Sequence, residues 1–155
     1  KERKFYPDAN STLRVAYGNV KSMNPSDGKI YNYFTTTDGI LEKIDNSNPD
    51  FEFPAGLEKL IRDKDFGAYA KNGSVPVAFL ASNHTTNGNS GSPVLNAKGQ
   101  LIGINFDRVW EGNMSDYFFD ENTCRNIAMD MHYFLFVVEK YGKASRLIEE
   151  MKIIR

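Results

Sequence analysis

Residues 88–93, with the sequence Gly-Asn-Ser-Gly-Ser-Pro, constrain the fold of this chain more than any other stretch. Glycine adopts backbone angles that other residues resist, so its two glycines predict a sharp turn. Pro93 then sets the angle at which the next segment begins. Apolar segments typical of strands lie on both sides, at residues 75–81 and 101–106. We therefore expect a tight loop between antiparallel strands.

A serine in such a loop can act as a nucleophile. Attack of Ser90 Oγ on a carbonyl creates an oxyanion, which needs two backbone N–H groups aimed at one point. The N–H groups of Gly88 and Ser90 are the candidate donors, as in a nucleophile loop of the chymotrypsin type. The alternative is an ordinary hairpin turn rich in Ser, Gly and Asn. The full six-residue string between apolar strands favours the catalytic interpretation.

Hydrophobic patterning predicts a mainly β fold. Six strands are expected, at residues 13–20 (with a bulge at Gly18), 30–34, 40–44, 75–81, 93–95 and 101–106. Helical spacing is expected within 55–71, at 126–141 and around 147–151. The prediction is one domain over 1–155. It has a chymotrypsin-like antiparallel six-stranded barrel over 1–110, a helical insertion near 55–71 and C-terminal helices at 126–151.

Composition excludes several classes of function. The 155 residues are 41% hydrophobic, enough for a core, and the net charge of −1 has no basic run that would favour nucleic acid. No segment approaches the roughly 20 apolar residues of a membrane span.

The single cysteine, Cys124, is expected to be a buried thiol. No metal and no cofactor is predicted. The start at Lys1, without methionine, suggests an internal piece or a trimmed chain.

The general base that Ser90 needs is harder to find. The chain has two histidines, His84 and His132. His84 lies six residues before Ser90, so aiming its ring at Ser90 Oγ requires a contorted loop, and His132 lies inside a predicted helix. Both are expected to be structural or exposed. The base of chymotrypsin-like proteins comes from a separate upstream barrel. We therefore expect the second barrel only, with the catalytic His and Asp outside this chain.

Two longer stretches, residues 85–94 and 99–111, resemble the bacterial serine dipeptidyl-peptidase family that includes the seven-type and eleven-type enzymes. Residues 5–10, 13–14, 17–18 and 124–128 carry the same resemblance, which covers nearly the whole chain and corresponds to about the last fifth of the family's length. Glutamyl endopeptidases share the Gly-Asn-Ser-Gly-Ser-Pro core, but their likeness fades outside it.

The resemblance implies a periplasmic or cell-surface bacterial exopeptidase that releases dipeptides from the free amino end of peptides. Ser90 matches the family's nucleophile, and the N–H groups of Gly88 and Ser90 match its oxyanion donors. Asp107 matches an acidic position that holds the substrate's α-ammonium group. Arg108 matches the arginine of the primary pocket in the acidic-specific eleven-type enzymes, where the seven-type enzymes have glycine.

The chemistry of the residues fits those roles, because a guanidinium group can bind both oxygens of a substrate carboxylate. The alternative is an exposed Asp107–Arg108 surface pair. Neighbouring strand residues point to opposite faces, so one of the two side chains could face a pocket while the other turns away. The family's catalytic histidine and aspartate, its other amino-end anchors and its helical capping domain have no match in this chain.

The predicted function is the serine half of a dipeptidyl peptidase that prefers Asp or Glu before the scissile bond. Its partners are a peptide with a free N-terminus and the missing N-terminal barrel and helical domain of the same protein. Alone, the chain is expected to be inactive and, with one flank uncovered, to dimerise or aggregate at high concentration. The alternatives are a non-catalytic pseudo-enzyme, a self-associating subdomain, or a protease like the glutamyl endopeptidases.

Overall fold

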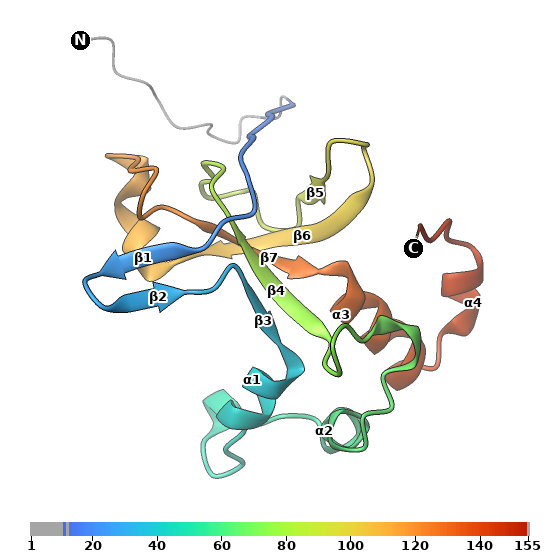
Figure 1. Ribbon diagram of the computed structural model, residues 1–155. Coiled ribbons are helices and arrows are strands. Elements are labelled where there is room, and N and C mark those ends of the chain that lie inside the picture. The colour runs from blue at the N-terminus through green and yellow to red at the C-terminus, as the bar shows by residue number, and fades with distance from the viewer. Residues whose placement is uncertain (1–10, 12, 155) are drawn as a thin grey trace. The chain divides into compact units, whose positions relative to one another are not determined.

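The computed structural model describes residue 11 and residues 13–154, so the resemblance at residues 5–10 lies outside the described residues. The chain divides into two compact units (Figure 1). The first runs through Phe34 and includes Ala78–Met129, and the second comprises Thr35–Val77 and the residues from Asp130 onward. One domain over 1–155 stays a prediction.

Most residues of the antiparallel strands lie in the first unit. Strands β1 (Met23–Ser26) and β2 (Lys29–Tyr31) form a two-stranded sheet. The larger sheet has the order β3-β4-β7-β6-β5, with the bounds Phe34–Thr36, Pro76–Ala81, Asn126–Asp130, Leu101–Arg108 and Pro93–Leu95. In its register Leu80 pairs with Ile127, and Val94 pairs with Gly103. A 3₁₀ segment, Trp110–Asp116, follows β6.

The mainly β, antiparallel class predicted from the sequence is confirmed. The larger sheet is open, with β3 and β5 at its edges, and no pairing joins these edges within the described residues. Closure of a six-stranded barrel therefore stays a prediction. The turn between β5 and β6 is as tight as its sequence implied. Asn96 Oδ1 accepts hydrogen bonds from the N–H groups of Lys98 and Gln100, and Gly99 has a φ of +73°.

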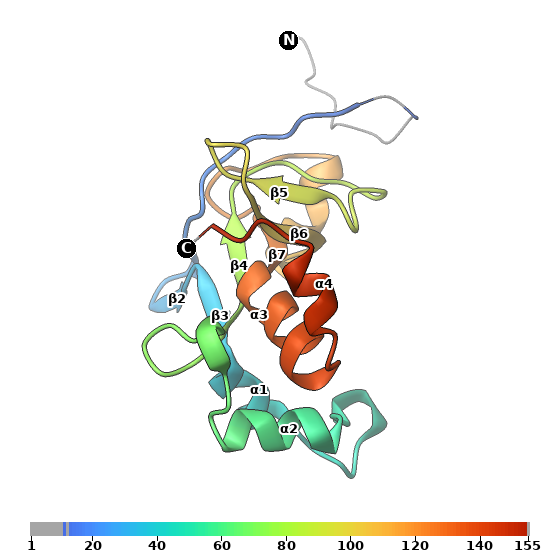
Figure 2. The ribbon, with the colours of Figure 1, turned by 90° about the vertical axis from the view of Figure 1, so that its right-hand side faces the viewer.

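The second unit gathers the helices around an apolar core. They are α1 (Thr37–Lys43), α2 (Ala55–Arg62), α3 (Met131–Phe136) and α4 (Ser145–Glu149), with short 3₁₀ turns at Pro49–Phe51 and Gly67–Tyr69 and a π-helical turn at Val137–Tyr141 (Figure 2). The buried residues of the core are Leu57, Ile61, Phe66, Tyr69, Val75 and Phe136. The rings of Phe66 and Phe136 meet edge to face with centroids 5.8 Å apart. No helix in the described part is both long enough and apolar enough to cross a bilayer.

Residues 40–43 of the segment 40–44, predicted as a strand, belong instead to helix α1, which ends at Lys43. Thr36 caps this helix by accepting a hydrogen bond from the Asp38 N–H group at 3.4 Å, and Asp38 lies in the first turn, where a negative charge is favourable. A short apolar run does not by itself distinguish a strand from a helix. The capping signal, four residues upstream of the run, decided the outcome.

Residues 126–130, predicted as the start of the C-terminal helix, form strand β7. Pairing with β4 buries this segment, and Ala128 is fully buried. The helix begins one residue after Asp130, whose side chain caps it by accepting from the His132 N–H group at 2.8 Å. From Met131 onward the helical spacing of the apolar residues corresponds to a helix. Before that point, pairing with β4 makes the segment a strand in spite of the same spacing.

The half-buried strand predicted at residues 13–20 is also wrong. Leu13, Val15 and Tyr17 are 91%, 76% and 90% exposed, and among the described residues only the end of this segment pairs, through a bridge between Val20 and Ala81. Alternating apolar residues indicate a strand with one face to cover. Burial needs a neighbouring segment, which the alternation itself cannot supply.

Candidate active site

Two glycines allow the loop that contains Ser90 to turn sharply. Gly88 has a φ of +93° and Gly91 a φ of +84°, in the region that residues with side chains rarely adopt. Asn89 closes the turn: its Oδ1 accepts from the Thr86 N–H group at 2.8 Å, and its N–H group donates to Thr86 O at 3.2 Å. The sharp turn predicted for residues 88–93 is therefore present.

Strand β6 fastens this loop from the other side. The Gly91 N–H group donates to Asn105 O at 2.8 Å, and the Asn105 N–H group donates to Ser92 O at 2.9 Å. Both bonds lie on the C-terminal side of Ser90, so the loop leaves the turn in a fixed direction toward β5.

Ser90 is exposed at the surface of the first unit. Its Oγ donates a hydrogen bond to the backbone oxygen of Phe106 at 3.3 Å. A carbonyl oxygen does not take up a proton at neutral pH, so this contact orients the hydroxyl without activating it. The N–H groups of Gly88 and Ser90 donate to no atom within the described residues. They are therefore available to a ligand.

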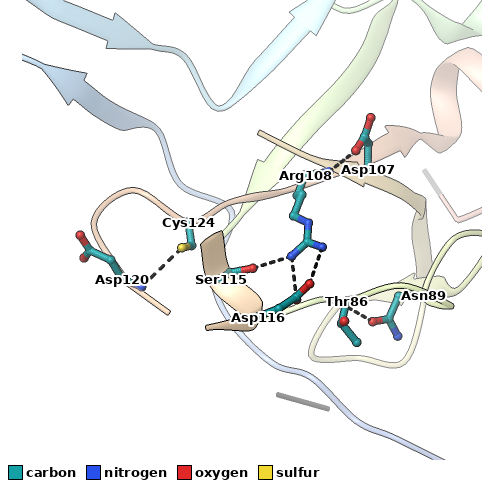
Figure 3. A network of polar contacts seen from close by, with 8 residues as sticks. All are labelled: Thr86, Asn89, Asp107, Arg108, Ser115, Asp116, Asp120 and Cys124. Atoms are coloured by element: carbon teal, nitrogen blue, oxygen red, sulfur yellow. Dashed lines mark hydrogen bonds and ion pairs between the residues drawn. The ribbon is translucent and has the colours of Figure 1, made fainter. Parts of the chain in front are cut away.

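Asp107 and Arg108 end β6 with their side chains on opposite sides of the strand (Figure 3). Asp107 Oδ1 accepts a hydrogen bond from the Arg108 N–H group at 2.7 Å. The Arg108 guanidinium group turns the other way and binds the carboxylate of Asp116 at two points, at 2.9 and 3.0 Å. Its Nη1 also donates to Ser115 Oγ at 2.6 Å. Asp107 and Arg108 are thus not a simple surface ion pair with each other.

This arrangement occupies only part of the Arg108 guanidinium group. The two terminal nitrogens hold Asp116 and Ser115, while Nε donates to no atom within the described residues. A guanidinium group presents five N–H donors, so a second acceptor can still bind along its Nε side. The hydrogen bond from Arg108 lowers the pKa of Asp116 below its ordinary value, and the same bond raises the pKa of Arg108. Both groups are therefore charged near neutral pH.

A small cavity opens beside Arg108, lined in part by His84, Ser115, Phe119 and Asn126. The His84 ring stacks on Phe119 with centroids 4.5 Å apart. Its Nε2 and the Oδ1 of Asn126 are buried without a hydrogen-bond partner within the described residues. Burial lowers the pKa of His84, although the Asp116 carboxylate partly opposes this effect. His84 is therefore neutral near pH 7 and shares a cavity with Arg108.

His132 and Cys124, which the sequence analysis also considered, lie in surroundings typical of structural residues. In the second unit, Nδ1 of His132 lies 2.6 Å from Oδ1 of Asp130, at the start of α3. In the first unit, Cys124 is a buried free thiol, 3% exposed, that accepts a hydrogen bond from the Asp120 N–H group. Within the described residues no three side chains of His, Cys, Asp or Glu are grouped so that they could hold a metal ion.

Sequence reasoning missed two residues that organise this region. Asn105 is a buried polar residue among the apolar residues 101–106 of β6, and that break in the pattern was the available signal. Asp116 lies eight residues after Arg108, and no periodicity links the two, since the 3₁₀ segment turns the chain back on itself.

Comparison with known proteins places these features in one family. The model of the family Peptidase S46 matches residues 1–153. The chain is 52% identical over 151 residues to an Asp/Glu-specific dipeptidyl-peptidase of Flavobacterium psychrophilum, covering 97% of this chain and 21% of that protein. It is also 52% identical over 149 residues to dipeptidyl-peptidase 7 of Phocaeicola vulgatus, covering 96% of this chain and 21% of the relative.

A solved structure agrees with the sequence matches. The crystal structure of Porphyromonas endodontalis DPP11 in complex with the dipeptide Arg-Glu has a TM-score of 0.89 and 45% identity, covering 92% of this chain and 21% of that one. The chain thus spans about a fifth of the length of the relatives it matches. Overall identity is equal for an Asp/Glu-specific relative and a dipeptidyl-peptidase 7, so it does not distinguish the two specificities.

Proposed function

Because the chain belongs to the Peptidase S46 family, we propose that the protein carrying it is a serine dipeptidyl peptidase that releases dipeptides ending in Asp or Glu. The observation that carries the proposal is Arg108. Its guanidinium group is held at the end of β6 beside a cavity, and its Nε has no hydrogen-bond partner within the described residues.

Ser90 is the proposed nucleophile. Its Oγ attacks the carbonyl carbon of the second residue of the peptide and loses its proton to a general base. The resulting oxyanion accepts hydrogen bonds from the N–H groups of Gly88 and Ser90, which have no other acceptor within the described residues. Collapse of the intermediate transfers the proton to the leaving amine and leaves an acyl-enzyme. Water then attacks the acyl-enzyme, which releases the dipeptide and restores the Ser90 hydroxyl.

Arg108 supplies the acidic preference in this proposal. A carboxylate that leaves water needs a fixed cation and well-oriented donors to compensate its lost hydration. Arg108 is already oriented by Asp116 and Ser115, so little side-chain entropy is lost when a substrate carboxylate binds. Asp116 balances the charge of Arg108, so selectivity rests on directed hydrogen bonds more than on net charge.

Asp107 binds the α-ammonium group of the substrate in this proposal. Its carboxylate lies on the opposite side of β6 from the Arg108 guanidinium group, and Oδ1 is oriented by the Arg108 N–H group. Separate positions for the cation and the anion suit a dipeptide, whose free amino group and acidic side chain lie on different residues.

The general base is proposed to come from another part of the protein. His84 has stacked, partly buried surroundings beside Arg108, and Ser90 Oγ donates to a backbone carbonyl instead of an imidazole. The proposed base and its aspartate belong to an N-terminal barrel, with a helical domain completing the site. A periplasmic or cell-surface location in a bacterium, and self-association of the isolated chain, are further parts of the proposal. The location rests on the family resemblance alone.

Kinetics of the full-length protein test this function. Dipeptide substrates with Glu, Asp or Leu before a fluorogenic leaving group are compared for the parent, Ser90→Ala and Ser92→Ala. Ser92 is the matched control because it lies in the same loop and contributes its backbone oxygen to Asn105. We expect preference for Glu and Asp, loss of activity by about 10⁶ in Ser90→Ala, and near-parent activity in Ser92→Ala.

Three results contradict the proposal in different ways. An inactive full-length parent supports the pseudo-enzyme alternative. Cleavage of amino-blocked substrates as fast as free ones supports an endopeptidase of the glutamyl type. Full activity of Ser90→Ala excludes the serine mechanism.

A further inference from the structure

We infer that Asn105 and Asn126 are positioning residues that aim the Ser90 N–H group into the oxyanion site, an inference that rests on the proposed function. Asn105 Nδ2 donates to the backbone oxygen of Asn89 at 3.2 Å. Asn126 Nδ2 donates to Asn105 Oδ1 at 2.8 Å. The two side chains thus form a relay from strand β7 through β6 to the loop.

The hydrogen bond to Asn89 O acts on the peptide unit that carries the Ser90 N–H group. In a planar trans peptide the C=O and N–H bonds point in opposite directions. A donor that holds the C=O on the strand side therefore directs the N–H away from the strand, toward the open side of the loop. Rotation of this one peptide unit would turn the Ser90 N–H group out of the oxyanion site.

Within the loop, one backbone bond reaches this peptide unit: the Ser92 N–H group donates to Asn89 O at 3.0 Å. The two backbone bonds from Asn105 hold Gly91 N–H and Ser92 O, on the far side of Ser90. Both glycines beside this unit, Gly88 and Gly91, permit wide changes of backbone angle. The side-chain amide of Asn105 is therefore the only side chain within the described residues that binds Asn89 O, and its bond ties this oxygen to strand β6.

Asn126 determines which end of the Asn105 amide faces the loop. An amide can turn over and exchange its oxygen and nitrogen, which would set Asn105 Oδ1 against Asn89 O. The donor on Asn126 prevents this exchange because it requires an oxygen opposite it. Asn105 and Asn126 are 5% and 1% exposed, so water competes little for either bond.

The structure thereby explains two buried polar residues between apolar strand residues. The amide oxygen of Asn126 is buried and has no partner within the described residues, which costs stability. An apolar side chain at the same core position would avoid that cost. Orientation of the catalytic peptide unit is a role that an apolar residue of similar size cannot fill.

The test uses the full-length protein with the substitutions Asn105→Asp and Asn126→Asp. Asn105→Asp keeps the size and the acceptor for Asn126 but replaces the donor to Asn89 O with an oxygen. Asn126→Asp changes no residue that contacts the loop, but its new oxygen attracts Asn105 Nδ2, turns the Asn105 amide over and so removes the bond to Asn89 O. The matched control is Asn96→Asp, which removes the same kind of donor, to Gln100 Oε1 at 2.7 Å, in the β5–β6 turn.

We expect kcat to fall about 100-fold in Asn105→Asp and by a smaller factor in Asn126→Asp, the size of effect seen when one oxyanion donor is lost. KM should change less than about threefold, since the oxyanion contact forms only in the transition state. Phosphonylation of Ser90 by a fluorophosphonate should slow in parallel with kcat, because its tetrahedral adduct also places an oxygen anion in the site. Asn96→Asp should behave as the parent.

Rates are expressed per folded molecule, with the folded fraction taken from thermal melts, so a loss of stability alone is not counted. If both variants retain kcat within about threefold of the parent per folded molecule, the inference is wrong. It is equally wrong if kcat is unchanged and only KM rises. If Asn105→Asp does not fold, Asn126→Asp decides alone, because it alters no residue of the loop. Full activity of Ser90→Ala would instead overturn the proposed function itself.

Discussion

The guanidinium group of Arg108 and the carboxylate of Asp116 face each other through two parallel hydrogen bonds of 2.9 and 3.0 Å. The side chains are 16% and 25% exposed, so the pair is largely withdrawn from water. It forms because β6 ends at Arg108 and the 3₁₀ segment Trp110–Asp116 returns the chain to the same place. The orientation of Arg108 is therefore determined before any ligand binds.

Asp116→Asn should destabilise the chain by about 2 kcal/mol at pH 7, the scale of a hydrogen bond to a charged group. For a chain of this length the melting temperature should fall by about 4–8 °C. Asp116 has a pKa lowered in the folded state from the ordinary value of 3.8, so its contribution is complete above that value. It is lost as the pH falls through the lowered pKa. The difference between parent and variant in thermal melts should therefore shrink below about pH 4.

Asp63→Asn is the control for this measurement. Asp63 pairs with Lys59 on the surface of α2, and the two side chains are 54% and 76% exposed. Such pairs contribute less than about 1 kcal/mol. A change as large as that of Asp116→Asn would mean that burial of the Arg108–Asp116 pair has no special effect.

Arg108→Gly in the full-length protein should lower kcat/KM for acidic substrates by roughly one to four decades, since truncating one partner of a desolvated pair costs about 2–5 kcal/mol. Apolar substrates should be affected less or accepted better. The double variant Arg108→Gly/Asp116→Ser separates loss of the cation from exposure of the Asp116 charge. Equal losses for acidic and apolar substrates would make Arg108 a structural residue.

Asp107→Ala should lower kcat/KM for every substrate with a free amino end, because it removes the proposed partner of the α-ammonium group. The loss should not depend on which side chain enters the pocket. The measurement is kcat/KM for Glu and Leu substrates, each with a free and an acetylated amino group. In the variant, the difference in kcat/KM between substrates with a free and with an acetylated amino group should be smaller than in the parent. A loss confined to the Glu substrate would argue instead that Asp107 acts through Arg108.

The 155-residue chain by itself should show only background hydrolysis of dipeptide substrates. Loss of the triad histidine costs on the order of 10⁶ in kcat in subtilisin, and neither histidine here lies in surroundings that present a base to Ser90. The check is a fluorogenic assay of the purified chain beside its Ser90→Ala variant. A robust rate that this substitution abolishes would reinstate His84 or His132 as the base.

Phe136→Ala should destabilise the second unit by about 3–5 kcal/mol, because Phe136 is fully buried and its ring packs on Phe66. The melting temperature should fall by about 6–20 °C. Phe118, in the first unit, is 65% exposed and serves as the control, with an expected change within about 0.5 kcal/mol for Phe118→Ala. Comparable effects of both substitutions would contradict the location of the core.

Much of the fold could be predicted where local chemistry is decisive. The β5–β6 hairpin and the turn around Ser90 follow from glycine and asparagine, whose backbone preferences act over three or four residues. Strand β4 and the helix beginning at Ala55 were likewise predicted from apolar spacing. A local cap explains the error at residues 40–44, but the errors at 13–20 and 126–130 lie where a distant partner decides, as in β7, which pairs with β4 across more than forty residues.

The candidate site divides in the same way. Residue identity determined that Ser90, Asp107 and Arg108 bring a hydroxyl, an anion and a cation to neighbouring strands, and that glycines turn the loop that carries Ser90. Only the tertiary structure decided that Arg108 turns to Asp116, that His84 joins the same cavity, and that Asn105 and Asn126 hold the Asn89–Ser90 peptide. The reason is physical. Backbone preferences are encoded within a few residues, whereas hydrogen bonds between side chains depend on which strands pair and on how the chain returns between them.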